Sequence, residues 1–195
     1  MKKILSGVII LLLSFQTLFA YSQNELSSAN KLASEGIISQ QDNAKDYRLN
    51  DNITRKEFMK VVANITKETI EDTCDNSFND VADDWGCKYI EWALKKWFIA
   101  ANATFRPDAN ITKAESMKLI LKARWFIRVQ NTDDWRVDDM MSAAQNGIIS
   151  QRYYDYDTFA SRWWIFEVMA TEKWTHTVWN TTDKTSWPEW RNATP

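Results

Sequence analysis

The sequence predicts an all-α protein whose three helix-loop-helix repeats pack as a pseudo-three-fold bundle. A helix-ending pattern and a helix-starting pattern each occur three times in the same order. After each helix start, apolar residues recur at the helical period of about 3.6. A single helix pair cannot bury its apolar face alone, so the three copies are expected to pack together.

The helix-ending pattern lies at residues 33–39, 94–100 and 144–150. Each copy consists of the end of an expected helix, one residue at which that helix terminates (the punctuating residue), and then two apolar residues. The punctuating residues are Gly36, Trp97 and Gly147. Glycine is usual at this place because helices commonly end on a residue with left-handed backbone conformation.

The helix-starting pattern is a capping box. Thr54 and Thr112 are followed three residues later by Glu57 and Glu115, which satisfies two orphan backbone donors at each helix start. In the third copy Ser161 can cap, but the glutamate is missing. An aromatic residue stands seven positions before each cap: Tyr47, Phe105 and Tyr154. Helices are therefore expected to start near these three caps.

Trp85 and Trp135 each stand twelve positions before a punctuating residue, and the first copy has Asn24 there. Two interpretations are open. The favoured one is core packing, because large aromatic side chains dominate core energetics. The other is a platform for a sugar ring.

The first 22 residues read as a secretory signal peptide: a basic start, an apolar run and a small-residue cleavage site. An uncleaved membrane anchor is the alternative, but the run is shorter than the ~20 apolar residues of a spanning helix. We expect an exported protein with repeats at 23–66 (partial), 74–125 and 128–173, and a flexible tail at 174–195.

Composition narrows the functional classes. The net charge is −2, which gives no electrostatic footprint for nucleic acid. The one histidine, His176, lies in the tail, so neither a zinc site nor a Ser-His-Asp order is expected. No carboxylates stand in a recognisable catalytic motif, and we expect no cofactor, no metal and no catalytic residues.

Cys74 and Cys87 are the two cysteines. In an exported protein an even pair predicts a disulfide, and two free thiols are the alternative. The loop between them is short, which limits the entropic stabilisation to about 3 kcal/mol.

The ordered set of motifs resembles the S-layer homology family, whose repeats run F-x-D-V, W, A-x-x-x-G-I, F-x-P and I-T-R-x-E. The second copy fits best, with Phe78–Val81, Trp85, Phe105–Pro107 and Ile111–Glu115. The F-x-D-V motif occurs only in this copy. The resemblance covers roughly residues 24 to 172.

The resemblance implies a prism around a central helix bundle that holds acidic, often pyruvylated, wall polysaccharide in grooves between repeats. It implies a cation in each groove from the I-T-R-x-E motif, and we expect the adjacent helix N-terminus to offer backbone N–H groups to an anion. The expected ligand-binding residues are Arg55, Lys113, Arg162, Asp80, Trp85 and Trp135.

The predicted function is therefore non-catalytic anchoring in the cell envelope. The expected partner is acidic cell-wall polysaccharide or peptidoglycan, together with other surface-layer subunits if the chain belongs to a surface assembly. The alternative is a small secreted hydrolase of cell-wall glycan, which would need two carboxylates facing each other across a cleft.

Glycine and tryptophan occur in unusual numbers: four glycines and eleven tryptophans in 195 residues. Glycine normally makes up about 7% of a protein. We hypothesise that several tryptophans are glycines in the cell, in a lineage that reads UGA as glycine: Trp97, Trp125, Trp163 and those of the tail. The alternative is a genuinely unusual composition.

Overall fold

The computed structural model describes residues 23–124, 126, 128, 132–149 and 155–171. Within these residues the regular structure is helical, and strand-like pairing is limited to isolated bridges. The elements are α2 (Gln23–Ser34), the 3-10 helix η1 (Ala44–Tyr47), α3 (Arg55–Ile65), α4 (Cys87–Lys95), α5 (Lys113–Ala123), α6 (Trp135–Gln145) and α7 (Arg162–Ala170). The all-α prediction is confirmed.

Several predicted features lie outside the described residues: the signal peptide, Tyr154, Trp125 and the tail. The division into three repeats stays a prediction. In the part of the chain that is described, no helix has both the length and the apolar character needed to cross a membrane.

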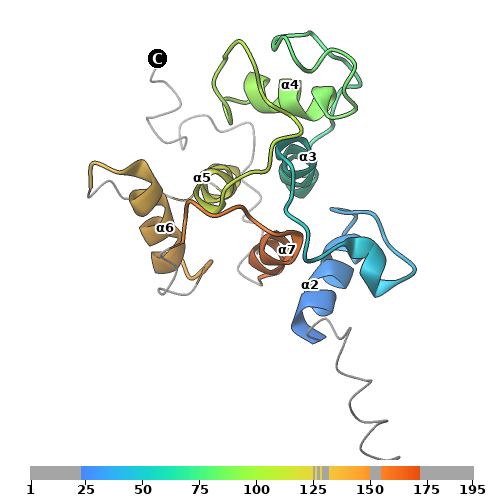
Figure 1. Cartoon of the computed structure of the whole chain (residues 1–195), viewed down its shortest axis with the longest axis vertical. Helices are drawn as coiled ribbons and strands as arrows, with labels where there is room; N and C mark the ends of the chain where they lie inside the picture. Colours follow the sequence, from blue (N-terminus) through green and yellow to red (C-terminus); the bar gives the residue numbers. More distant parts are fainter. Residues whose placement is uncertain (1–22, 125, 127, 129–131, 150–154, 172–195) are drawn as a thin grey trace, which may run out of the picture.

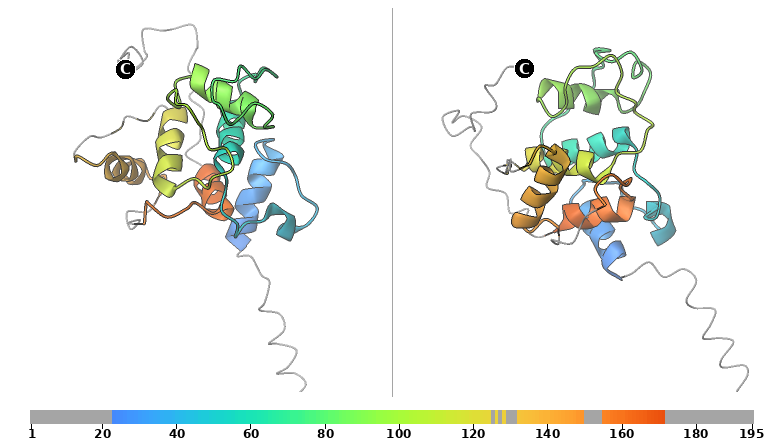
Figure 2. Two further views of the ribbon diagram at one scale, coloured as in Figure 1. Left: turned by 45° about the horizontal axis from the view of Figure 1, so that its top comes forward. Right: turned by 60° about the vertical axis from the view of Figure 1, so that its left-hand side comes forward.

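Each of the outer helices α2, α4 and α6 packs against one of the inner helices α3, α5 and α7 (Figure 1). Helix α4 packs on α3, α6 packs on α5, and α2 packs on α7, while α3 also contacts α5. The pairing of α2 with α7 brings the first and last described helices together, as the two further views also show (Figure 2).

A closed ring of three backbone hydrogen bonds joins the segments that precede α3, α5 and α7. Ile53 N–H donates to the Ala160 carbonyl (3.0 Å), Ala160 N–H to the Ile111 carbonyl (2.9 Å), and Ile111 N–H to the Ile53 carbonyl (3.2 Å). All three residues are buried, where an unpaired backbone group would be costly. The ring therefore fixes where each inner helix begins.

The inner helices begin where the capping pattern predicts. Both halves of the capping box form at Thr54–Glu57 and at Thr112–Glu115. Ser161 accepts a hydrogen bond from the Trp164 amide, and with no glutamate three residues on, the reciprocal half is absent. The predicted helix starts are confirmed.

The outer helices end in the same way. Gly36, Trp97 and Gly147 have positive φ angles of 73°, 62° and 64°. In each case the N–H of the following residue donates to the carbonyl of the residue five positions earlier. Phe98 N–H, for example, donates to the Ala93 carbonyl (2.8 Å). The Trp97 side chain is 70% exposed, so little packing offsets the strain of its left-handed backbone. Trp163, in contrast, lies in the first turn of α7, where the backbone does not favour glycine.

We predict that Trp97→Gly raises the free energy of unfolding by about 1 kcal/mol, because only glycine adopts this conformation without a steric cost. Gly36→Ala is the matched control. A Cβ at Gly36 would meet no atom within 4 Å, so only backbone strain acts, and stability should fall by a similar amount. Denaturant unfolding measures both changes. A Trp97→Gly variant less stable than the parent would contradict the prediction, and mass spectrometry of the native protein would show directly which residue stands at position 97.

Cys74 and Cys87 form the predicted disulfide, with Cα atoms 5.6 Å apart. It ties the loop after α3 to the first residue of α4. Trp85 lies just before α4 rather than within it, so the disulfide also restrains the segment that carries this tryptophan.

We predict that Cys74→Ser combined with Cys87→Ser lowers the free energy of unfolding by about 3 kcal/mol, as expected from the short loop that the bond closes. Denaturant unfolding of the oxidised parent and the double variant tests this. Adding reductant should destabilise the parent and leave the double variant unchanged; equal effects on both would count against a disulfide in the folded protein.

Candidate ligand-binding groove

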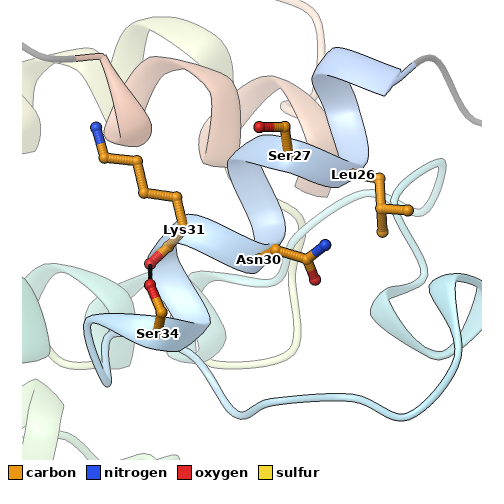
Figure 3. Close-up of a pocket in the computed structure, with 5 residues that line it drawn as sticks. All are labelled: Leu26, Ser27, Asn30, Lys31 and Ser34. Carbon is orange, nitrogen blue, oxygen red and sulfur yellow. Dashed lines mark hydrogen bonds between the residues drawn. The ribbon is translucent and has the colours of Figure 1, made fainter.

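Two of the hollows in the described surface are lined by residues of the helices and their connecting loops. The first, about 510 Å³, runs along α2 and is lined by Leu26, Ser27, Asn30, Lys31 and Ser34 (Figure 3). All of its lining residues come from one helix. Ser34 bonds the Lys31 carbonyl and Lys31 bonds the Ala170 carbonyl, so two of its polar groups serve the helices themselves. None of the predicted site residues lies there.

The second hollow, about 240 Å³, gathers residues from several segments. We call it the Trp85 groove. Its lining includes Ser39, Gln41, Tyr47, Glu57, Lys60, Trp85 and Arg162. Two of the six predicted ligand-binding residues, Trp85 and Arg162, therefore meet in one groove although they are far apart in the sequence.

Arg162, the first residue of α7, reaches across to α3. Its Nε donates to the Tyr47 carbonyl (2.9 Å), and its Nη1 lies 3.1 Å from Glu57 Oε1. Burial lowers the pKa of Arg162, and the charge of Glu57 opposes this shift. A guanidinium remains charged in proteins even so. Glu57 is thus both a helix cap and the counter-ion of Arg162.

Arg55, the first residue of α3, repeats this arrangement on α5. Its Nε donates to the Phe105 carbonyl (2.9 Å), and its Nη1 donates to Glu115 Oε1 (3.1 Å). Burial lowers the pKa of Arg55 as well, against the attraction of Glu115. Arg55 and Arg162 are therefore both engaged in joining neighbouring inner helices.

Lys113, the first residue of α5, meets a different partner on α7. The residue in the glutamate position is Trp164, and the Lys113 ammonium lies 5.7 Å from the centroid of its ring. Lys113 Nζ also donates to Asp155 Oδ2 (2.5 Å). The three predicted cations thus occupy similar places, but the structure does not bring them together in one site.

The expectation that helix N-termini offer amides to an anion is wrong. The first amide of each inner helix already donates to a loop carbonyl: Arg55 to Ala109 (2.9 Å), Lys113 to Thr158 (2.9 Å) and Arg162 to Asp51 (2.8 Å). The second amides also bond loop carbonyls, and the third bond the cap hydroxyls. These backbone N–H groups are therefore already hydrogen-bonded, most of them to neighbouring loops, and are not available to an anion.

Asp80 holds a loop in place. Its two oxygens accept hydrogen bonds from the amides of Phe105 (2.8 Å) and Arg106 (2.7 Å). Burial alone would raise the pKa of Asp80, but these backbone bonds outweigh it and lower the pKa. Asp80 does not line the Trp85 groove, and its observed contacts are those of a loop anchor.

Trp85 and Trp135 are not core residues, contrary to the favoured interpretation. Their exposed fractions are 50% and 40%. Each ring lies beside a neighbouring inner helix, because Trp85 is contacted by lysines of α3 and Trp135 by a lysine of α5. Of the two, Trp85 lines the groove, and an exposed ring there is suited to contact the flat face of a sugar.

Sequence reasoning missed two lysines. Lys60 Nζ lies 5.8 Å from the Trp85 ring centroid, and Lys118 Nζ lies 4.6 Å from the Trp135 ring centroid. The signal was present, since each lysine stands six residues after its capping threonine. A lysine at this position is also typical of a solvent-exposed helix face. Only the structure shows that each of these lysines lies beside an exposed tryptophan.

Cys74, Cys87 and Glu91 place possible metal-ligand atoms within 4.8 Å of one another. The two sulfurs are joined in a disulfide and offer no thiolate. Both Glu91 oxygens accept hydrogen bonds from Ser77. These three residues therefore do not fit a metal site while the disulfide is intact.

The described helices form a bundle with a groove in which an exposed aromatic ring lies beside basic side chains. Residues 77–115 match the family model of the S-layer homology domain. Domains of this family are non-catalytic modules that attach proteins to the cell surface by binding cell-wall polymers, so the match implies an envelope protein. No curated protein matches the chain.

We predict that Arg55→Ala lowers the free energy of unfolding by about 1–3 kcal/mol. The change removes the partly buried guanidinium that pairs with Glu115 and donates to the Phe105 carbonyl. Arg106→Ala is the control, since Arg106 is exposed and should change stability by no more than about 0.5 kcal/mol. Denaturant unfolding compares the two. Similar small effects would mean that Arg55 is an ordinary surface charge.

Proposed function

We propose that this protein is exported and anchors to the cell wall through three S-layer-homology-type repeats packed about a pseudo-three-fold axis. The ligand is acidic cell-wall polysaccharide or peptidoglycan, and the chain acts as a small anchor or as a subunit of a surface assembly. The family match covers only the second of these repeats.

The ring of hydrogen bonds supports the three-repeat arrangement. Ile53, Ile111 and Ala160 each stand one residue before a cap, and each donates to one member of the ring and accepts from the other. The first amides of α3, α5 and α7 likewise each donate to the segment preceding another inner helix. Such a cyclic pattern is expected of three equivalent units.

One observation carries the proposal of wall binding. Trp85 belongs to the matched residues, is half exposed, and lines a groove together with Lys60 and Arg162. An aromatic platform beside cations suits an acidic saccharide, because the ring takes the apolar sugar face and the cations take the carboxylate.

We predict that the purified exported protein co-sediments with isolated cell-wall sacculi and that Trp85→Ala weakens this binding about ten-fold, equivalent to roughly 1.4 kcal/mol. Trp97→Ala is the matched control, because Trp97 is the more exposed residue and does not line the groove. Circular dichroism checks that both variants fold.

Soluble sugar should be measured in the same experiment. No release above the protein-free sample is expected for a binding module. Release of sugar from the sacculi would favour the hydrolase alternative, and equal binding by Trp85→Ala and Trp97→Ala would remove Trp85 from the site.

A further inference from the structure

Lys60 and Lys118 occupy matching places beside exposed tryptophans. Lys60 lies on α3 next to Trp85, and Lys118 lies on α5 next to Trp135. Both ammonium groups are within 6 Å of the ring centroid, the usual range of a cation–π contact. Two separate outer–inner helix junctions therefore present the same pair of side chains.

In the Trp85 groove, Lys60 is the lining cation without an ion pair among the described residues. One lining carboxylate, Asp46, also has none there and accepts a hydrogen bond from the Asn43 side-chain amide (3.0 Å). Arg162 is paired with Glu57. Lys56, the other lysine beside Trp85, lies 2.8 Å from Asp84 and 2.6 Å from Asp108. Among the residues that the structure describes, no carboxylate lies within ion-pair distance of Lys60.

On α5, Lys118 and Lys122 both lack an ion pair within the described residues. Arg55 is paired with Glu115 there, and Lys118 has no carboxylate within ion-pair distance in the described ranges. Asp139 acts on Lys118 electrostatically, but its carboxylate bonds Arg128. Lys122 donates to the carbonyls of Trp97 and Phe98, which leaves Lys118 as the cation beside the Trp135 ring.

The third junction, between α7 and α2, is different. The residue six positions after Ser161 is Glu167, where α3 and α5 have lysine. Burial raises the pKa of Glu167, and Glu25 on α2 adds to this shift. Asn24 stands in the tryptophan position. This junction lacks the tryptophan and lysine pair of the other two. Its cation, Lys31 of α2, donates instead to the Ala170 carbonyl at the end of α7, and the carboxylate of Glu167 stands in the lysine position.

We propose that the Lys60–Trp85 and Lys118–Trp135 pairs select a carboxylate-bearing sugar of the wall polymer, and that the third junction does not bind it. The sugar ring lies on the indole, and the lysine ammonium pairs with the carboxylate as a point charge. Arg55 and Arg162 position the groove walls. This inference rests on the proposed function and assigns its specificity to lysines outside the I-T-R-x-E motif.

The test is co-sedimentation of the full exported chain with isolated sacculi, for the parent, Lys60→Met, Lys118→Met and the double variant. Methionine keeps an unbranched apolar stem beside each tryptophan and removes the charge. Each single change should weaken binding, and the double change should weaken it about ten-fold or more. Lys95→Met, an exposed lysine of α4 outside the groove, should bind like the parent.

Two treatments of the sacculi identify the source of the carboxylate. Carbodiimide amidation removes carboxylates from all wall polymers and should reduce parent binding to the level of the double variant. Hydrofluoric acid strips phosphate-linked polysaccharide and leaves peptidoglycan, so it distinguishes these two sources. Added salt should weaken the parent much more than the double variant, because salt screens the charge pairing.

The outcomes separate the two proposals. If the parent binds and the folded double variant binds equally well with the same salt dependence, the lysine assignment is wrong and the proposed function stands. If the parent does not sediment with any preparation of sacculi, both are overturned. A thermal melt of the double variant confirms folding, and if it does not fold, Lys60→Met and Lys118→Met alone decide the result.

Discussion

The ring of hydrogen bonds among Ile53, Ile111 and Ala160 is the constraint on which the rest of the structure depends. It holds the starts of α3, α5 and α7 together, and the first two amides of each helix then bond carbonyls of a neighbouring loop. Helix starts normally leave several donors unsatisfied. Here the junctions satisfy them, so the same contacts that build the core also remove the amides from reach of a ligand.

The cations at the first position of the inner helices follow from this arrangement. A positive charge there opposes the helix dipole, so its recurrence calls for a compensating partner. Arg55 and Arg162 find it in the capping glutamate of the next inner helix. One glutamate therefore caps its own helix and neutralises the arginine of another, which links local helix stability to the packing of the bundle.

The contact between α5 and α7 shows what happens when one member of this set is absent. Trp164 replaces the glutamate and is buried, and Lys113 combines a contact with its ring and a salt bridge to Asp155. The junction keeps its backbone bonds, because these do not depend on the side chain. At the neighbouring α7–α2 junction the tryptophan and the lysine are replaced by Asn24 and Glu167, and under our proposal this limits ligand recognition to the junctions that carry Lys60 and Lys118.

The sequence alone determined the helix starts and ends, the disulfide partners and the all-α class, because each depends on residues close together in the chain: a threonine and a glutamate three apart, or a left-handed residue after a helix. Only the tertiary structure decided that Trp85 and Trp135 face solvent and that Arg55 joins two helices. The partners of Arg55 lie 50 and 60 residues away, and no local pattern encodes which loop will lie beside them. Exposure and charge pairing are properties of the packed helices, so the groove could be placed only after packing was known.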